Sequence, residues 1–200
     1  ERYCPRVAPE TEPLLSRYGL AHGEYVLLVA TLEPRKDIGT LLDAWRMLPA
    51  SLRKSYPLVM TGSSGWRNSN LLKKIECFLA EGSVRHLGYV PDEVLPTLFS
   101  GTAVFSYPSV YEGFGLPVLE AMSSGVPVVC RAGTSMAEFA DGACVLCETG
   151  EAEELAQRLQ VLLESRELRR LWGQRGLAQS AAFSWERCAR EIRELYRSII

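Results

Sequence analysis

Short runs of apolar residues alternate with longer amphipathic stretches from residue 25 onward, and this alternation restricts the possible folds more than any other feature. The runs are almost continuously apolar, which is typical of strands covered on both faces. Strands that alternate with helices through short loops form a parallel sheet with helices on both of its faces. We therefore expect about six strands, at residues 25–30, 57–61, 84–88, 103–107, 126–130 and 143–146.

The stretches between these runs have helical periodicity. After the first run, one face of a helix would carry Ile38, Leu41, Leu42, Trp45 and Leu48. Further helices are expected at residues 71–79, 92–99, 116–124, 151–163, 167–179 and 185–198, with a shorter helical patch around 14–18. The pattern predicts a Rossmann-like α/β domain, in which ligands bind at the carboxyl ends of the strands.

Composition is that of an ordinary globular domain. The chain has 200 residues, of which 47% are hydrophobic and 23% charged, and this suits one domain with a single core. A formal net charge of −2 gives no reason to expect a nucleic acid as partner. No apolar run approaches the roughly 18 residues of a spanning helix, and no signal peptide opens the chain. We expect a cytoplasmic domain at residues 24–200, preceded by a polar lead-in or hinge at 1–23.

Six cysteines are scattered along the chain, and only Cys144 and Cys147 have the spacing of a zinc-binding pair. The sequence offers no second pair and no nearby histidine. Three-residue spacing places the two thiols on opposite faces of a strand. We therefore expect free buried thiols and no metal site.

The segment at residues 107–122 carries the strongest functional signal. A strand is followed by a loop that contains Glu112, and a helix is expected to begin at about Leu116. The turn between them consists of Gly113, Phe114 and Gly115. The first N–H groups of a helix have no partner within it, and the helix dipole makes that end positive. Two glycines let an anion approach the backbone, so the segment predicts a phosphate site.

Two carboxylates accompany this turn. Glu112 lies before the helix and Glu120 one turn inside it, so both could face one cleft. A carboxylate accepts two hydrogen bonds from a vicinal diol, as in ribose or a hexose. The alternative is an ordinary glycine loop with two solvated carboxylates. The segment is not the G-x-G-x-x-G pattern of a dinucleotide site.

A basic loop follows the first expected strand and places Arg35 and Lys36 just before a helix, at the same edge of the sheet. Two cations there suit a diphosphate, because arginine binds it through a planar fork and lysine as a point charge. The alternative is a solvated basic pair on the surface.

The sequence Tyr-Glu-Gly-Phe-Gly-Leu-Pro-Val-Leu-Glu-Ala-Met at residues 111–122 resembles the family-four glycosyltransferases, a large retaining group with the GT-B fold. Other segments resemble the family in the expected order: Leu-Glu-Pro-Arg-Lys-Asp-Ile (32–38), Leu-Gly-Tyr-Val-Pro-Asp (87–92), Gly-Val-Pro-Val-Val (125–129) and Phe-Ser-Trp-Glu (183–186). The resemblance covers about residues 25–196 and includes the strand–turn–helix context of the motif. It implies that the chain is the C-terminal, donor-binding half of a GT-B enzyme.

The resemblance also implies roles for individual residues. Glu112 would contact hydroxyls of the donor hexose, and Glu120 would bind the ribose. Arg35 and Lys36 would stabilise the leaving diphosphate in place of a metal, so neither a metal nor another cofactor is expected. The sugar hydroxyls or the diphosphate would also be held by backbone N–H groups of Gly113, Phe114, Gly115 and Leu116.

Four further positions are candidates. Thr31 departs from the family, in which many members carry a phosphate-binding arginine at this position. A threonine occurs in members that resemble the Glu-Pro-Arg-Lys subgroup, so Arg35 is expected to compensate. Gly62 follows the second strand and is either a ligand contact or a turn residue. Tyr89 and Val90 follow the third strand, where the backbone of family members contacts the base.

The resemblance thus implies binding of a nucleoside-diphosphate sugar. GDP-mannose is the expected donor, because the Leu-Glu-Pro-Arg-Lys subgroup resembles mannosyltransferases of bacterial polysaccharide assembly. The chain begins without Met, which indicates a fragment boundary. Since GT-B enzymes have two such domains with the reaction between them, the resemblance implies that the N-terminal acceptor domain is missing and that the chain transfers no sugar alone. Any contact with the inner membrane would come through that missing domain.

Two other functions were weighed against this one. A non-catalytic nucleotide- or phosphate-binding module is the main alternative, although carboxylates near an anion argue against it. An epimerase of related GT-B fold fits less well, because that family lacks the Glu-Gly-Phe-Gly-Leu-Pro segment.

Overall fold

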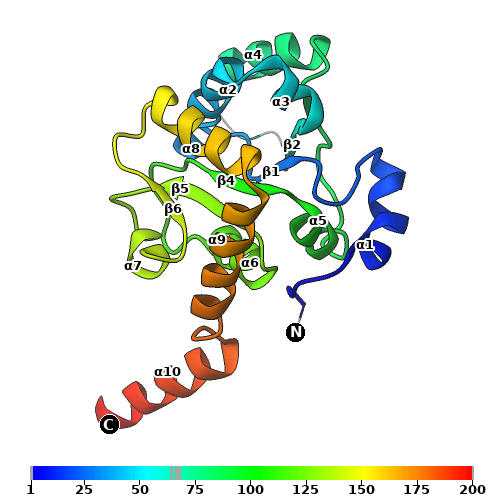
Figure 1. Cartoon of the computed structure of the whole chain (residues 1–200). Coiled ribbons are helices and arrows are strands. Elements are labelled where there is room, and N and C mark those ends of the chain that lie inside the picture. Colours follow the sequence, from blue (N-terminus) through cyan, green and yellow to red (C-terminus); the bar gives the residue numbers. More distant parts are fainter. Residues whose placement is uncertain (1, 64, 66–68, 200) are drawn as a thin grey trace.

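The computed structural model describes residues 2–63, 65 and 69–199 and contains the predicted parallel sheet (Figure 1). Its six strands are ordered β3-β2-β1-β4-β5-β6, and every neighbouring pair is parallel. The strands are β1 (Val26–Val29), β2 (Leu58–Thr61), β3 (Val84–His86), β4 (Val104–Tyr107), β5 (Val128–Arg131) and β6 (Val145–Cys147). The strand order reverses between β1 and β4, and such a switch point is where open α/β sheets bind ligands.

Helices connect these strands. They are α1 (Ala8–Leu15), α2 (Ile38–Met47), α3 (Ala50–Ser55), α4 (Ser69–Ala80), α5 (Leu95–Gly101), α6 (Leu116–Ser123), α7 (Ala137–Ala140), α8 (Ala152–Glu164), α9 (Arg166–Ser180) and α10 (Trp185–Ile199), with 3-10 turns η1 (Ser16–Tyr18) and η2 (Pro34–Lys36). Helices α3 and α7 were not expected from the sequence. Helix α3 buries no residue, so it leaves no apolar periodicity to read, and α7 is a single turn.

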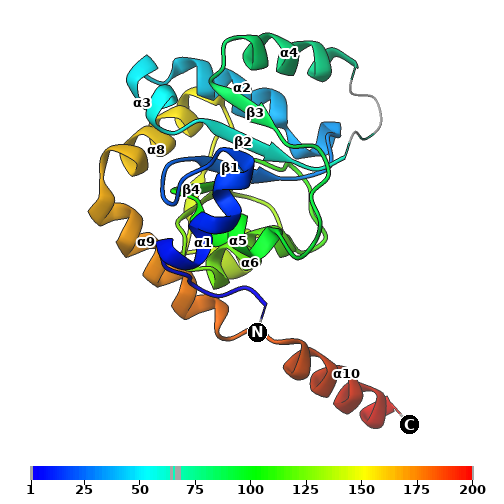
Figure 2. The same ribbon diagram turned by 90° about the vertical axis from the view of Figure 1, so that its right-hand side faces the viewer.

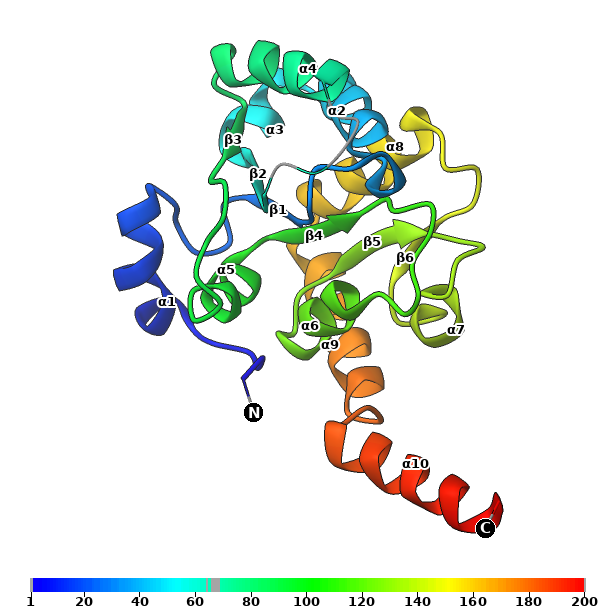
Figure 3. The same cartoon turned by 180° about the vertical axis from the view of Figure 1, so that it is seen from behind.

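Helices cover both faces of the sheet, as the sequence predicts. Helices α2, α3, α4 and α8 lie on one face, and α5, α6 and α7 lie on the other (Figures 1 and 3). The residues of β2 and β4 are buried throughout, as expected of central strands covered on both sides. Cys130, Cys144 and Cys147 are buried free thiols, as predicted.

The predicted lead-in contains more helix than expected, because α1 begins at Ala8 rather than near residue 14. Helix α1 packs against α5, and Leu15 and Leu20 belong to the buried core. The N–H of Gly23 donates to the carbonyl oxygen of Gly101 at 2.7 Å. Residues 2–23 are therefore attached to the body of the domain through apolar contacts and backbone hydrogen bonds.

Helix α9 packs against α6, α8, α7 and β5. It packs closely because Gly173 rests on the carbonyl group of Gly125, just before β5. Helix α10 then projects away from the domain and buries none of its residues (Figures 1 and 2). Among the described residues, no helix combines the length and the apolar character that a membrane span requires.

Two helical glycines should respond oppositely to alanine. A Cβ on Gly173 would overlap the Gly125 carbonyl oxygen, whereas a Cβ on Gly39 in α2 would meet no atom within 4 Å. We expect Gly173→Ala to lower the free energy of unfolding by about 1–3 kcal/mol through overpacking. Gly39→Ala should raise it by up to about 1 kcal/mol, because alanine favours helices. Urea unfolding of both variants checks this, and equal stabilisation would contradict the packing of α9.

Candidate functional site

The loops after β1 and β4 meet at the carboxyl edge of the sheet. The N–H of Val110 donates to the carbonyl oxygen of Arg35 at 2.9 Å, which joins the loop before α6 to the basic loop. Both strands are buried, so their ends hold the two loops at fixed positions. The structure therefore brings Arg35, Lys36 and Glu112 together, as the sequence predicts for residues at neighbouring strand ends.

The carboxylate of Glu112 is surrounded by four side-chain donors. Its Oε1 accepts hydrogen bonds from Lys36 Nζ at 2.5 Å, Ser109 Oγ at 2.7 Å and Tyr107 hydroxyl at 3.0 Å. Its Oε2 accepts one from Arg35 Nη1 at 3.0 Å. Burial alone would raise the pKa of Glu112, but hydrogen bonds from Lys36, Ser109 and Tyr107 outweigh it and hold the pKa below its ordinary value. Glu112 is therefore a fixed anion.

Lys36 is the buried partner of this anion. Its side chain is only 8% exposed, and Nζ also donates to the Tyr107 hydroxyl at 2.6 Å and lies 5.0 Å from the centre of that ring. A buried ammonium group needs a counter-ion and hydrogen-bond acceptors, and Glu112 and Tyr107 supply them. An ammonium has three protons, so one donor remains for a ligand.

Arg35 is the accessible cation of the pair. Its side chain is 40% exposed, and it is paired with Glu112 through Nη1 and with Glu33 through Nη2 at 2.7 Å. Together with Lys36, this gives two cations that are paired with two carboxylates at this edge. The sequence predicts a positive pocket, and within the described part of the chain the charges of these four side chains sum to zero. A ligand anion would have to compete with Glu33 and Glu112 for Arg35.

The glycine turn has the backbone that an anion site needs. Gly115 adopts a φ of +100° as the N-cap of α6, and a Cβ there would lie 2.5 Å from Met136 Cγ, so only glycine fits. A Cβ on Gly113 would meet no atom within 4 Å, so this stretch of backbone is open to a ligand. The Ser135 hydroxyl donates to the Glu112 carbonyl oxygen at 2.8 Å and holds the turn from the other side.

Phe114 ties the turn to the C-terminal part of the chain. Its ring stacks on Phe139 of α7 with 4.8 Å between centroids, and Phe183, which lies between α9 and α10, meets both rings edge-on. Phe114 remains 40% exposed and the neighbouring Leu116 44% exposed. The side chains at residues 114 and 116 therefore have structural partners or face solvent, and their predicted contribution rests on the backbone.

Glu120 forms a separate cluster with residues from the beginning of the chain. The Tyr3 hydroxyl and the charges of Arg2 and Asp92 all influence the pKa of its carboxylate. Burial raises the pKa of Glu120 to about 7, while Tyr3 and Arg2 oppose the rise and Asp92 adds to it. The two carboxylates of the motif therefore have opposite pKa shifts. Asp92 closely follows Val90, which places this cluster near the loop predicted to contact the base.

The remaining candidates occupy the same edge with different exposure. Thr31 is exposed after β1. Gly62 has a φ of +139°, and a Cβ there would overlap the Ala30 carbonyl group, so close packing of two loops explains this glycine by itself. Tyr89 is 72% exposed, whereas the Val90 side chain is buried. Within the described part of the chain, none of these four residues forms a side-chain hydrogen bond or ion pair with Glu112.

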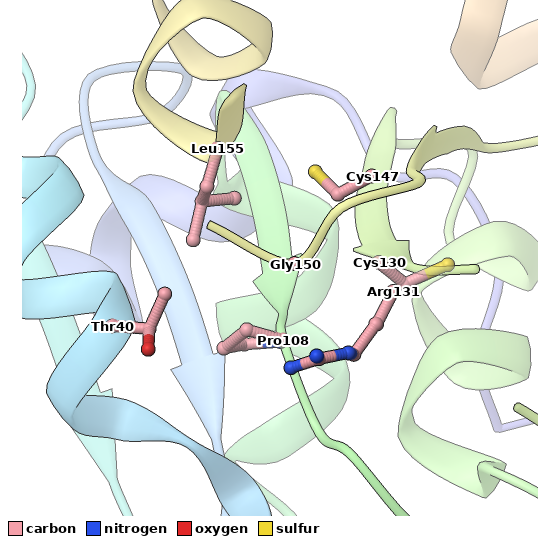
Figure 4. Close-up of a pocket in the computed structure, with 7 residues that line it drawn as sticks. All are labelled: Thr40, Pro108, Cys130, Arg131, Cys147, Gly150 and Leu155. Carbon is pink, nitrogen blue, oxygen red and sulfur yellow. The ribbon is translucent and has the colours of Figure 1, made fainter. Parts of the chain in front are cut away.

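An ion pair beneath the basic loop holds it in place. Asp37 has a φ of +48°, an unusual backbone for a residue other than glycine, and its carboxylate accepts hydrogen bonds from Thr40 Oγ1 at 2.8 Å and Arg131 Nη1 at 3.2 Å. The Arg131 side chain extends from the end of β5 past Pro108 (Figure 4). The cavity around it has a volume of about 10 Å³, room for one water at most. Arg131 is therefore a support of the loop.

Several of these residues escaped the sequence-based prediction. Tyr107 and Ser109 lie five and three positions before Glu112, so the motif itself contained them, but neither residue type signals a partner for a carboxylate. Ser135, which binds the Glu112 carbonyl oxygen, and Arg131, which pairs with Asp37, lie far along the chain from the residues that they contact. Tyr3 lies far from Glu120 in sequence and carried no local signal at all.

The two carboxylates should change stability with pH in opposite directions. Because the folded pKa of Glu120 is raised to about 7, its stabilising contribution is complete below the unfolded pKa of about 4.3 and is lost as the pH rises through 7. We expect Glu120→Gln to be more stable than the unchanged protein by on the order of 1 kcal/mol at pH 8, and equally stable near pH 4.5. Urea unfolding at both pH values checks this.

Glu112→Gln is the matched comparison. In the unchanged protein, the folded pKa of Glu112 is lowered. The stability that its carboxylate contributes is therefore present above the unfolded pKa and is lost as the pH falls through the folded pKa. The variant should be less stable by roughly 3 kcal/mol at pH 8, since it leaves Lys36 buried without a counter-ion. A Glu120→Gln variant that loses stability at pH 8 would contradict the assigned environments.

Comparisons of the sequence point to one family. The family described as Glycosyl transferases group 1 matches residues 18–179. The O-antigen chain mannosyltransferase B of Escherichia coli is 43% identical over 195 residues, which is 98% of this chain and 51% of that protein. The MMP alpha-(1->4)-mannosyltransferase of Mycolicibacterium hassiacum is 40% identical over 197 residues, or 96% of this chain and 47% of that protein. The chain spans about half the length of these relatives.

Solved structures show the same fold. HepE from Anabaena, crystallised with UDP and glucose, has a TM-score of 0.84 at 22% identity, covering 97% of this chain and 53% of its own. The C-terminal domain of the group 1 glycosyltransferase LpcC from Francisella tularensis has a TM-score of 0.76 at 19% identity, covering 90% of this chain and 94% of its own. The chain has the fold of one half of a GT-B glycosyltransferase, and it belongs to the family of group 1 glycosyl transferases.

Proposed function

We propose that this chain binds a nucleoside-diphosphate sugar at the carboxyl edge of its sheet. In the longer protein, the hexose would be transferred with retention to an acceptor during glycan or polysaccharide synthesis. GDP-mannose is the proposed donor. Two relatives that are at least 40% identical are named mannosyltransferases, which supports mannose as the sugar. HepE was crystallised with UDP, so the base has to be tested separately.

The observation that carries the proposal is the joint placement of Glu112, Lys36 and Arg35 beside the open backbone of Gly113. A diphosphate would accept a hydrogen bond from the third N–H of the Lys36 ammonium group. It would also draw the exposed Arg35 side chain away from Glu33. The N-terminus of α6 supplies further positive potential. As the sugar–phosphate bond breaks, these groups would stabilise the charge that develops on the leaving diphosphate. We propose that no metal ion is needed for this step.

Glu112 would face the sugar without attacking it. Its carboxylate accepts hydrogen bonds from Lys36, Tyr107, Ser109 and Arg35, which lowers its nucleophilicity and fixes its orientation. Such a group suits hydrogen bonds from hexose hydroxyls. This supports a route in which the leaving phosphate assists the acceptor on the same face, with retention at the anomeric carbon. A module that only held phosphate would gain nothing from a fixed anion at this place.

The acceptor side would come from the other half of the protein. Helix α10 has large exposed apolar side chains that no part of the described chain covers: Trp185, Ile192, Leu195, Tyr196 and Ile199. Since the relatives are about twice as long, we propose that this face packs against their additional half. We also propose that the protein acts in the cytoplasm and that the other half mediates any contact with the inner membrane.

Isothermal titration of the 200-residue chain tests donor binding. We expect GDP, UDP or their sugars to bind measurably, with GDP-mannose bound most tightly. Arg35→Gln should weaken nucleoside-diphosphate binding at least about tenfold, because it removes a charged hydrogen-bond donor. Gly113→Ala should weaken binding while leaving stability nearly unchanged. Arg46→Gln, on the outer face of α2, is the matched control and should bind normally. Absence of heat with every nucleotide would refute the proposal.

Transfer must be tested in the longer protein. Glu112→Gln there should reduce the rate of hexose transfer by at least about 100-fold, because it removes a fixed charge next to the reacting sugar. The anomeric configuration of the product, read by NMR, should match that of the donor. An inverted product would exclude retention, and unchanged transfer by the variant would favour a non-catalytic role for the site.

A further inference from the structure

An ion pair joins the end of β5 to the basic loop across the end of β4. In the strand order β1-β4-β5, Arg131 at the end of β5 and Asp37 in the loop after β1 lie on either side of β4. Arg131 Nη1 donates to Asp37 Oδ2 at 3.2 Å, and the side chain passes Pro108, the first residue after β4 (Figure 4). The two side chains are 29% and 25% exposed, so water and salt screen the pair only in part.

Arg131 reaches the basic loop from a fixed base. Its backbone pairs with Cys147 of β6, and its carbonyl oxygen accepts a hydrogen bond from Thr134 Oγ1 at 3.2 Å. Gly150, in the loop after β6, covers the guanidinium group so closely that an added Cβ would overlap Cζ of Arg131. The loops after β5 and β6 therefore fix the guanidinium group at the place where it meets Asp37.

Asp37 is the residue at which the basic loop turns into α2. The 3-10 turn η2 ends at Lys36 and α2 begins at Ile38, and Asp37 between them has the left-handed angles φ +48° and ψ +39°. This conformation is unfavourable for a residue with a Cβ. Both oxygens of the Asp37 carboxylate are held, Oδ1 by Thr40 Oγ1 at 2.8 Å and Oδ2 by Arg131. These two contacts offset the strain and keep the turn in place.

The positions of Arg35 and Lys36 depend on this turn. A right-handed Asp37 would change the angle between η2 and α2. Helix α2 is anchored in the core from its first residue, Ile38, so the change would fall on η2. Lys36 directly precedes Asp37, and its contact with Glu112 requires the present direction of η2. The ion pair with Arg131 therefore acts on the cations of the basic loop through one backbone conformation.

Building on the proposed function, we propose that Arg131 is a positioning residue of the donor site, which keeps Asp37 left-handed and thereby directs Lys36 and Arg35 toward the diphosphate. Arg131 acts through Asp37 rather than on the ligand itself. The donor site then extends to the ends of β5 and β6, beyond the loops after β1 and β4 that contain its charged groups. Loss of the ion pair should weaken donor binding in a protein that is still folded.

Substitutions of Arg131 in the 200-residue chain test this, with GDP affinity measured by isothermal titration, or UDP affinity if the unchanged protein prefers UDP. We expect Arg131→Gln to bind about 3–10-fold more weakly, the effect of one disturbed hydrogen bond to the ligand. Arg131→Lys keeps the charge and should recover part of the affinity. Arg53→Gln is the matched control and should bind normally, because Arg53 pairs with Glu81 at 3.7 Å on the amino side of the sheet.

Substitutions of Asp37 separate the ion pair from the backbone conformation. Asp37→Ala and Asp37→Gly both remove the carboxylate, but only glycine adopts the left-handed conformation without strain. Asp37→Gly should therefore bind GDP more tightly than Asp37→Ala. Adding Arg131→Gln to Asp37→Gly should cause no further loss of affinity, because the arginine acts through the aspartate.

Three results would overturn the role of Arg131 and leave the proposed function intact. They are normal GDP binding by Arg131→Gln, equal losses in Asp37→Ala and Asp37→Gly, and a further loss when Arg131→Gln is added to Asp37→Gly, which would indicate direct contact with the ligand. Urea unfolding shows whether each variant is folded, and the two Asp37 variants decide the matter if Arg131→Gln does not fold. Failure of the unchanged chain to bind any nucleotide would refute both proposals.

Discussion

The interaction on which the site depends is the contact between the Glu112 carboxylate and the buried ammonium group of Lys36 beneath the Tyr107 ring. It joins the loops after β1 and β4, the two strands at which the order of the sheet reverses. Neither charge is stable alone in this position, because a buried ion without its partner costs several kcal/mol. The pair therefore sets the position of the glycine turn and, through it, the start of α6.

The two carboxylates of the motif show how one short segment provides two chemical environments. Hydrogen-bond donors hold the pKa of Glu112 below its ordinary value, whereas burial raises the pKa of Glu120 to about 7. The difference arises from burial and neighbours, since the residue type is the same. Groups with divergent titration behaviour gather at functional sites, and this pair separates the sugar side of the proposed site from its nucleoside side.

The sheet could be predicted from sequence because its strands are buried on both faces and therefore read as apolar runs, such as the run that ends at Tyr107. The positions of Arg35, Lys36 and Glu112 followed from the rule that parallel strands end at one edge. Their charge balance could not be predicted, because it depends on which side chains turn toward each other. The influence of Tyr3 on the pKa of Glu120 could not be predicted either, because it joins the start of the chain to α6.

Among the residues that the structure describes, the charges of Glu33, Arg35, Lys36 and Glu112 sum to zero, and this balance has a kinetic consequence. A cleft lined by one sign of charge accelerates the arrival of an oppositely charged ligand from a distance, and salt suppresses that acceleration. These four balanced side chains together project little field into solution. An incoming anion would meet attraction only within contact range, so its rate of arrival would depend little on ionic strength, and selectivity would arise from exchange of partners after the encounter.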